Sequence, residues 1–238
     1  MPKLFCVSDI HGFYDEFKAA LDAAGFDQNN PDHWLISCGD NFDRGSQPKE
    51  VMRFLNALER KILVRGNHED LLEQMIERGY PMQHDKHNRT VDTVLDLARF
   101  PHRARYFQEA CAEVEPMVSR FTAQMVDFFE TQNYVFVHGW LPVKNGSVVW
   151  PNASESDWSQ ARWINGIACA LQCLTIDKTV VCGHWHSSYG HAMLEGTPEF
   201  GCGADFSPFY TEGVIAIDGC TSVSGRVNVV VIEDEFLA

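Results

Sequence analysis

The chain has 238 residues, 45% of them hydrophobic, which suits one α/β unit with a sizeable core. Its formal net charge of −14 argues against a general binder of nucleic-acid backbones, because such binding needs a broad cationic surface. No apolar run reaches about 18 residues, and residues 1–8 lead directly into the first expected strand, so we expect a cytoplasmic protein with no membrane span and no signal peptide.

Apolar runs of strand length recur along the chain. We expect strands at residues 4–7, 34–38, 62–64, 134–137, 179–182, 213–217 and 226–232. Apolar residues at helical spacing predict helices before Gly25, after Pro48 and before Gly79. The alternation of strand and helix through residue 78 predicts parallel pairing with right-handed crossovers. The last two strands, joined around Gly225, are expected to form a hairpin.

Residues 80–133 contain no clear strand, and their apolar residues repeat at helical spacing in 91–98 and 118–129. We interpret this stretch as a helical cap inserted into a single domain of residues 1–238. The alternative is that these helices only cover one face of the sheet.

Eight cysteines are present without any CxxC pair. Cys6, Cys38 and Cys182 fall in or beside expected core strands, where thiols behave as small hydrophobic groups. We therefore expect mostly buried, reduced cysteines, and a structural zinc site or redox bridge is the less favoured alternative.

Polar side chains follow several of the expected strands. Asp9 and His11 are two residues apart, so in an extended segment both point to one side and can reach one ion. Asp40 follows the next strand, and a carboxylate can bridge two cations roughly 3.5–4 Å apart. Asn67 offers an amide oxygen, and the later corners add imidazoles at His138, His184 and His186. This mixture of nitrogen and oxygen ligands suits Mn, Fe or Zn.

The ordered set of motifs resembles the signature of calcineurin-like metallophosphoesterases, and in particular of their phosphoprotein phosphatase branch. The motifs are Asp9-x-His11-Gly12, Gly39-Asp40-x-x-Asp43-Arg44-Gly45, Arg65-Gly66-Asn67-His68-Glu69, His138-Gly139 and Gly183-His184. The resemblance spans residues 4 to about 218. It implies a four-layer α/β/β/α sandwich of two mixed sheets flanked by helices, with two divalent metal ions between the loops. Mn is the expected ion, with Fe and Zn as alternatives.

The resemblance also implies a role for individual residues. Asp9, His11 and Asp40 would hold the first metal, and the second would be held by Asp40, Asn67, His138 and His184. His68 would be the catalytic imidazole, oriented by Asp43. Arg44 would bind the substrate phosphate.

Two further assignments are less direct. Arg162, in the segment Asp157–Trp163, is the candidate for a second phosphate-binding arginine, and the alternative is a surface arginine stacked on a tryptophan. His186 resembles the second histidine of a GHxH motif, so it is either an additional metal ligand or a supporting residue behind the ligands. Trp140, directly after His138-Gly139, is expected to narrow the substrate groove.

The function implied is hydrolysis of phosphomonoesters by a metal-bridging hydroxide, with phosphoserine or phosphothreonine in proteins, or a small phosphoester, as substrate. The alternative is a dinucleoside polyphosphate hydrolase of the diadenosine tetraphosphate type, for which Phe200, Phe206, Phe209 and Tyr210 are candidates for an aromatic platform. A hypothesis of another class is a metal-bearing, non-catalytic binding protein. The intact Asp43, Arg44 and His68 argue against it.

Overall fold

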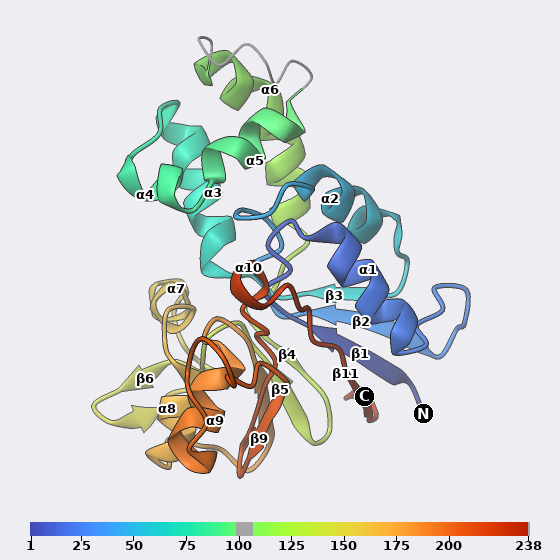
Figure 1. Cartoon of the computed structure of the whole chain (residues 1–238), viewed down its shortest axis with the longest axis vertical. Helices are drawn as coiled ribbons and strands as arrows, with labels where there is room; N and C mark the ends of the chain where they lie inside the picture. Colours follow the sequence, from blue (N-terminus) through green and yellow to red (C-terminus); the bar gives the residue numbers. More distant parts are fainter. Residues whose placement is uncertain (99–106, 238) are drawn as a thin grey trace.

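The structure, a computed structural model, describes residues 1–98 and 107–237 (Figure 1). In these residues a first sheet has four strands in the order β11-β1-β2-β3. They are β1 (Lys3–Val7), β2 (His33–Ser37), β3 (Lys61–Leu63) and β11 (Val230–Glu233). β1, β2 and β3 pair in parallel, as the alternation of strand and helix predicts, and β11 pairs antiparallel with β1.

A second sheet has, among the described residues, five strands in the order β4-β5-β8-β10-β9. They are β4 (Phe129–Glu130), β5 (Tyr134–Phe136), β8 (Thr179–Cys182), β9 (Phe209–Thr211) and β10 (Val214–Ala216). β5, β8 and β10 are parallel, and the two edge strands β4 and β9 run antiparallel to their neighbours. A short hairpin, β6 (Val143–Lys144) with β7 (Ser147–Val148), stands apart from both sheets.

Helices cover the outer faces of the two sheets. The first sheet carries α1 (Tyr14–Ala23), α2 (Pro48–Ala57), α3 (Asn67–Arg78), α4 (Gln83–His87), α5 (Thr90–Leu97) and α6 (Phe107–Thr122) on its side of the molecule. The second sheet is accompanied by α7 (Glu155–Ala161), α8 (Gly166–Leu171) and α9 (Ser187–Glu195), and the short α10 (Thr221–Ser224) leads back to the first sheet. α2 begins at Pro48, whose fixed φ suits a first helical turn, and α3 ends at Gly79 in the left-handed conformation.

The strands alternate their side chains between two cores. In β1, Leu4 and Cys6 pack against the second sheet through residues such as Phe136, whereas Phe5 and Val7 pack against the helices. Period-two alternation with both faces buried places β1 inside the molecule. The predicted four-layer sandwich of two mixed sheets flanked by helices is confirmed.

The insertion differs from its prediction at its carboxyl end. α4, α5 and α6 occupy much of residues 83–122, and residues 99–106 of the expected cap lie outside the described part. The helical prediction is wrong for residues 123–129, because α6 ends at Thr122 and Phe129 belongs to β4, where it pairs with Phe136. Packing of the Phe129 ring between the sheets explains why an apolar residue recurs there without a helix. The division into one domain with a cap remains an interpretation.

The predicted carboxyl-terminal hairpin is wrong. β10 lies in the second sheet and β11 in the first, with α10 between them. β11 instead closes the free edge of β1, where Val230 and Ile232 enter the core between the sheets. Burial of this alternating face outweighs local pairing across the turn at Gly225.

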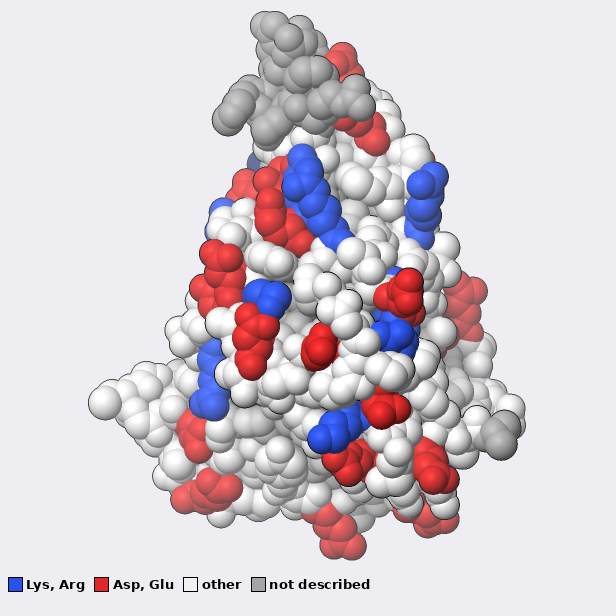
Figure 2. All heavy atoms as spheres, turned by 90° about the vertical axis from the view of Figure 1, so that its right-hand side faces the viewer, with Lys and Arg blue, Asp and Glu red and all other residues white. Residues whose placement is uncertain are grey.

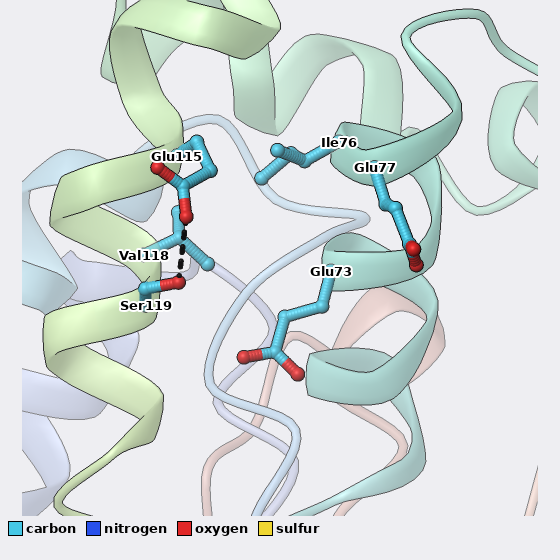
Figure 3. A pocket seen from close by; sticks show the side chains of 6 residues that line it. All are labelled: Glu73, Ile76, Glu77, Glu115, Val118 and Ser119. Carbon is cyan, nitrogen blue, oxygen red and sulfur yellow. Dashed lines mark hydrogen bonds between the residues drawn. The ribbon is translucent and has the colours of Figure 1, made fainter.

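Charged residues are mixed on the surface. On the face shown in Figure 2, Lys and Arg side chains stand among Asp and Glu, and its described residues form no continuous basic patch. A hollow of about 280 Å³ between α3 and α6 is also acidic, with Glu73, Glu77 and Glu115 in its lining (Figure 3). Such a lining disfavours a phosphate-bearing ligand in this hollow. None of the described helices is both long and apolar enough to cross a membrane.

Candidate metal centre and active site

The candidate site residues lie where strands of both sheets end. Asp9 follows β1, Asp40 follows β2, His138 follows β5 and His184 follows β8. Backbone hydrogen bonds join these loops: the Asp9 amide donates to the Gly39 carbonyl at 3.1 Å, and the Gly183 amide donates to the His138 carbonyl at 2.8 Å. The His184 amide also donates to Asp9 Oδ2 at 2.9 Å, so the loops of the two sheets meet at this site.

The backbone at this site is strained. Six of its residues have φ between 51° and 70°, the left-handed region that non-glycine residues avoid: Asp9, His11, Asp40, Asp43, Arg44 and His184. Such conformations persist only where the surrounding structure imposes them, and they concentrate at functional sites.

A first group of ligand atoms comprises Asp9, His11 and Asp40. His11 Nε2 lies 3.7 Å from Asp9 Oδ1 and 3.8 Å from Asp40 Oδ2. Its Nδ1 donates to the Phe42 carbonyl at 2.9 Å, which directs the lone pair of Nε2 toward the carboxylates. Burial, with the charges of Arg44 and His68, holds the pKa of His11 well below its ordinary value, so the ring is neutral and able to bind a metal.

A second group comprises Asp40, Asn67, His138 and His184. Asn67 Oδ1 lies 2.8 Å from His138 Nε2 and 3.0 Å from His184 Nδ1, and His138 Nε2 lies 3.3 Å from Asp40 Oδ1. Burial and the nearby His138 lower the pKa of His184 to about 3, so this ring is also neutral. Asp40 thus turns Oδ2 toward the first group and Oδ1 toward the second, which is the arrangement of a bridging carboxylate.

The donor set fits a cation. His138 Nδ1 donates to the Cys38 carbonyl at 2.8 Å, so Nε2 is the atom that faces the oxygens of Asn67 and Asp40. Burial lowers the pKa of His138, but Asp40 and then Asp9 raise it more, to about 10. The oxygens of Asn67 and Asp40 around Nε2 favour a positive charge there, which a divalent ion would supply in place of a proton.

Glycines allow the loops to approach this closely. A Cβ atom on Gly183 would lie 1.8 Å from Ser8 Oγ and 2.2 Å from Asp9 Oδ2. A Cβ atom on Gly66 would lie 2.2 Å from Asp40 Oδ1. Any side chain at either position would displace a candidate metal ligand, which explains why glycine accompanies these motifs.

His68 stands beside the two groups. Its Nδ1 lies 2.8 Å from Asp43 Oδ2, and its Nε2 lies 3.4 Å from Arg44 Nη2 and 3.9 Å from Asp40 Oδ2. The His68 ring is close enough to His11 and Asp40 to share an ion with them, but the adjacent Arg44 cation opposes a metal at Nε2. Burial lowers the pKa of His68, but the charge of Asp40 and the hydrogen bond that His68 donates to Asp43 outweigh burial, so the net shift is upward.

Two threonines of α5 hold Asp43, and sequence reasoning missed both. Thr90 Oγ1 donates to Asp43 Oδ2 at 2.7 Å, and Thr93 Oγ1 donates to Asp43 Oδ1 at 2.9 Å. Thr93 Oγ1 also accepts the Asp43 amide at 3.1 Å. All three residues are buried. The helices of residues 83–122 therefore do more than cover a face, because α5 fixes the carboxylate that contacts His68.

Replacing Thr93 by Val should reduce kcat by about 10- to 100-fold, the usual cost of losing a residue that orients a catalytic or ligating group. Valine keeps the shape but removes the hydrogen bond that Thr93 donates to the buried Asp43 carboxylate and the one that it accepts from the Asp43 amide. Thr197→Val is the matched control, because its buried hydroxyl has no hydrogen-bond partner among the described residues. Steady-state kinetics with thermal unfolding would check this. An unchanged kcat in folded Thr93→Val protein would contradict the role.

Glu69 is a second residue that sequence reasoning left without a role. Its Oε2 accepts the amides of Asp40 and Gly66 at 3.0 and 2.9 Å, and its Oε1 accepts the Asn41 amide at 2.9 Å. Glu69 is buried, so these bonds are shielded from water. It joins the loop after β2 to the amino terminus of α3. The signal was its place in the Arg65–Glu69 motif, two residues after Asn67.

Arg162 is placed differently from Arg44. Its Nη1 donates to Asp70 Oδ2 at 2.7 Å and its Nη2 contacts Asp127. With Arg65 it lines a hollow of about 640 Å³ that also contains Asp70, Glu73, Glu77, Asp127 and Glu155. A phosphate would have to displace these carboxylates from Arg162, so Arg44 is the arginine that the structure brings beside His68.

Three other expectations can be compared with the structure. His186 lies outside both groups of ligand atoms, because its Nε2 faces Glu199 Oε1 at 3.3 Å and its Nδ1 faces Ser188 Oγ at 3.0 Å. Trp140 does not narrow a groove, since its ring is buried in the core and its Nε1 donates to the Leu174 carbonyl at 3.1 Å. Cys6, Cys38 and Cys182 are buried in the cores as predicted.

The structure thus combines a two-sheet sandwich with two groups of candidate His and Asp ligands that share Asp40 at the strand ends. The chain belongs to the calcineurin-like phosphoesterase family, whose model matches residues 2–188. It is thus an enzyme of the metallophosphoesterase superfamily, with candidate ligand groups for two divalent ions.

Similar proteins include curated relatives that share part of the chain. A symmetrical bis(5'-nucleosyl)-tetraphosphatase of Nitrosococcus oceani is 36% identical over 101 residues. That match covers 42% of this chain and only 34% of the relative's length.

Two solved structures share the fold. One, described as a proposed diadenosine tetraphosphatase, has a TM-score of 0.61 at 16% identity and covers 100% of this chain and 96% of its own. A cold-active protein-tyrosine phosphatase of a psychrophilic Shewanella species has a TM-score of 0.56 at 17% identity, with 98% and 76% coverage. At these identities both establish the fold alone.

Proposed function

We propose that this enzyme hydrolyses dinucleoside polyphosphates, with diadenosine tetraphosphate as the model substrate. Several partly matching relatives are named symmetrical bis(5'-nucleosyl)-tetraphosphatases, which supports this substrate class. The observation that carries hydrolysis is the position of Asp40, whose two oxygens face separate groups of ligand atoms beside His68.

In this proposal the metal ligands follow the two groups. Asp9, His11 and Asp40 hold one ion, and the other is held by Asp40, Asn67, His138 and His184. Two divalent ions, when bound, lower the pKa of water toward neutrality and neutralise charge on the phosphoryl oxygens. Mn is the ion with which we would load the protein.

Arg44 and His68 act on the substrate. Arg44 is partly exposed beside His68 Nε2, so its guanidinium can bind a phosphoryl oxygen. His68 delivers a proton from Nε2 to the departing oxygen, while Asp43 holds Nδ1 and stabilises the charged ring. Cleavage at the centre of the tetraphosphate would release two nucleoside diphosphates.

The same motifs resemble the phosphoprotein phosphatase branch, so a phosphothreonine peptide is the rival substrate. The hydrolysis rates of Mn-loaded protein on that peptide and on diadenosine tetraphosphate separate the two. We expect the dinucleotide to have the larger kcat/KM. A larger value for the peptide would overturn the proposed substrate class, and absence of turnover on both, with metal bound, would favour the non-catalytic binding protein.

A further inference from the structure

Two exposed indole rings flank His184. The side chain of Trp163, after α7, is 51% exposed, and that of Trp185 is 37% exposed. The Trp163 amide donates to the Gln160 carbonyl at 3.1 Å, and the Trp185 amide donates to the Gly183 carbonyl at 2.7 Å. Both tryptophans are therefore fixed relative to the candidate metal centre.

The rings of Trp163 and Trp185 lie at the border of the candidate metal centre, next to His184. The ring centroids of Trp163 and Trp185 lie 5.9 Å and 6.1 Å from that of His184, with interplanar angles of 80° and 57°. Beyond Trp185 the row of rings continues through His186, at 6.0 Å, to the half-exposed Phe200, at 4.7 Å from His186. An aromatic surface thus begins at a candidate metal ligand and runs outward.

These indoles do not serve the core. Trp140 and Trp158 are buried among the side chains of the second sheet's helices, whereas Trp163 and Trp185 belong to none of the core clusters of the described residues. Large aromatic rings left in water beside a polar centre are typical of a surface that meets a ligand.

We infer that Trp163 and Trp185 form a nucleobase subsite, on which one base of the substrate stacks while its phosphates reach the metal centre. This inference rests on the proposed function. The ligand must join a flat π system to a phosphate chain, because the aromatic surface and the phosphate-binding groups share one border at His184. A purine nucleotide has that chemistry, and base–aromatic stacking needs no hydrogen-bond pattern.

The experiment uses Mn-loaded full chain with diadenosine tetraphosphate and, as the base-free substrate, inorganic tetraphosphate. Trp163→Ala and Trp185→Ala should each lower kcat/KM on the dinucleotide by about 5- to 150-fold, the range for loss of one base–aromatic stack. On inorganic tetraphosphate the change should stay below about twofold. Trp163→Phe should recover most of the loss, and calorimetry should show weaker ADP binding by the alanine variants.

Tyr80→Ala is the matched control, because Tyr80 is 60% exposed and follows α3, outside the site. It should leave all rates unchanged. If the alanine variants keep the wild-type preference for the dinucleotide, or lose activity equally on both substrates, the subsite is overturned while the proposed function stands. If the wild type itself prefers inorganic tetraphosphate or a phosphothreonine peptide, the proposed substrate class fails first.

Discussion

Replacing His68 by Asn is expected to cut kcat by about 10²–10⁴-fold, the usual contribution of one general acid or base, while both metals stay bound. Asparagine keeps a polar side chain beside Asp43 and Arg44 but cannot supply a proton from the position of Nε2. Kinetics on metal-loaded protein, with metal content measured by mass spectrometry, checks both parts.

Metal content decides between two roles for His68, because its ring is also near enough to His11 and Asp40 to share an ion. Loss of one metal equivalent in His68→Asn would make His68 a ligand. The kinetic loss should also be smaller for 4-nitrophenyl phosphate, whose leaving group departs without a proton, than for an alkyl phosphate ester. An equal loss on both esters would contradict proton donation.

Replacing Asp40 by Asn is expected to lower metal affinity and activity by at least about 100-fold, because even residues that only orient a ligand cost 10- to 100-fold. The amide keeps the size of the side chain but loses the negative charge that faces His11 on one side and His138 on the other. Burial alone would raise the pKa of Asp40, yet the charges of His138 and His68 hold it well below its usual range, so the native group is a carboxylate.

The matched control is Asp22→Asn, since Asp22 is exposed and its carboxylate pairs with Lys18 at the helix surface. Metal titration by calorimetry and turnover under saturating metal would be compared for the two variants. If Asp40→Asn lost a single metal and kept the other with native affinity, Asp40 would serve one site rather than join two.

The candidate centre could be predicted because its information is local. Asp9, Asp40, His138 and His184 each follow a short apolar strand, and parallel strands bring such ends to one edge. A second reason is that the close approach of the loops leaves no room for a side chain, so glycine marks the motifs in the sequence, as at Gly66 and Gly183.

Contacts between distant segments could not be predicted from spacing. Thr90 and Thr93 reach Asp43 across 47 and 50 residues, and only the packing of α5 onto the first sheet's helices brings them there. Arg162 likewise contacts Asp70, which is 92 residues away in the sequence, because tertiary packing brings the two together. Its pairing with carboxylates therefore could not be predicted from the motif around it.

The two wrong predictions about the fold, the carboxyl-terminal hairpin and the helix over residues 123–129, have a related origin. Alternating apolar residues in 226–232 indicate a strand but not the sheet that receives it, and burial of Val230 between the sheets decided the outcome. Helical spacing around Phe129 came from aromatic packing against Phe236 and Phe136, which a period alone does not distinguish from a helix.

The hydrogen bonds from α5 to Asp43 have a consequence for chimeric versions of this enzyme. Exchanging the segment 83–122 for one without hydroxyl groups at positions 90 and 93 would leave every candidate metal ligand in place, yet it would remove the two hydroxyls that keep a buried carboxylate aligned. A chimera of that kind would bind ions normally and turn over slowly. The helices of the insertion and the loop that carries Asp43 should therefore be exchanged together when segments of this enzyme are swapped.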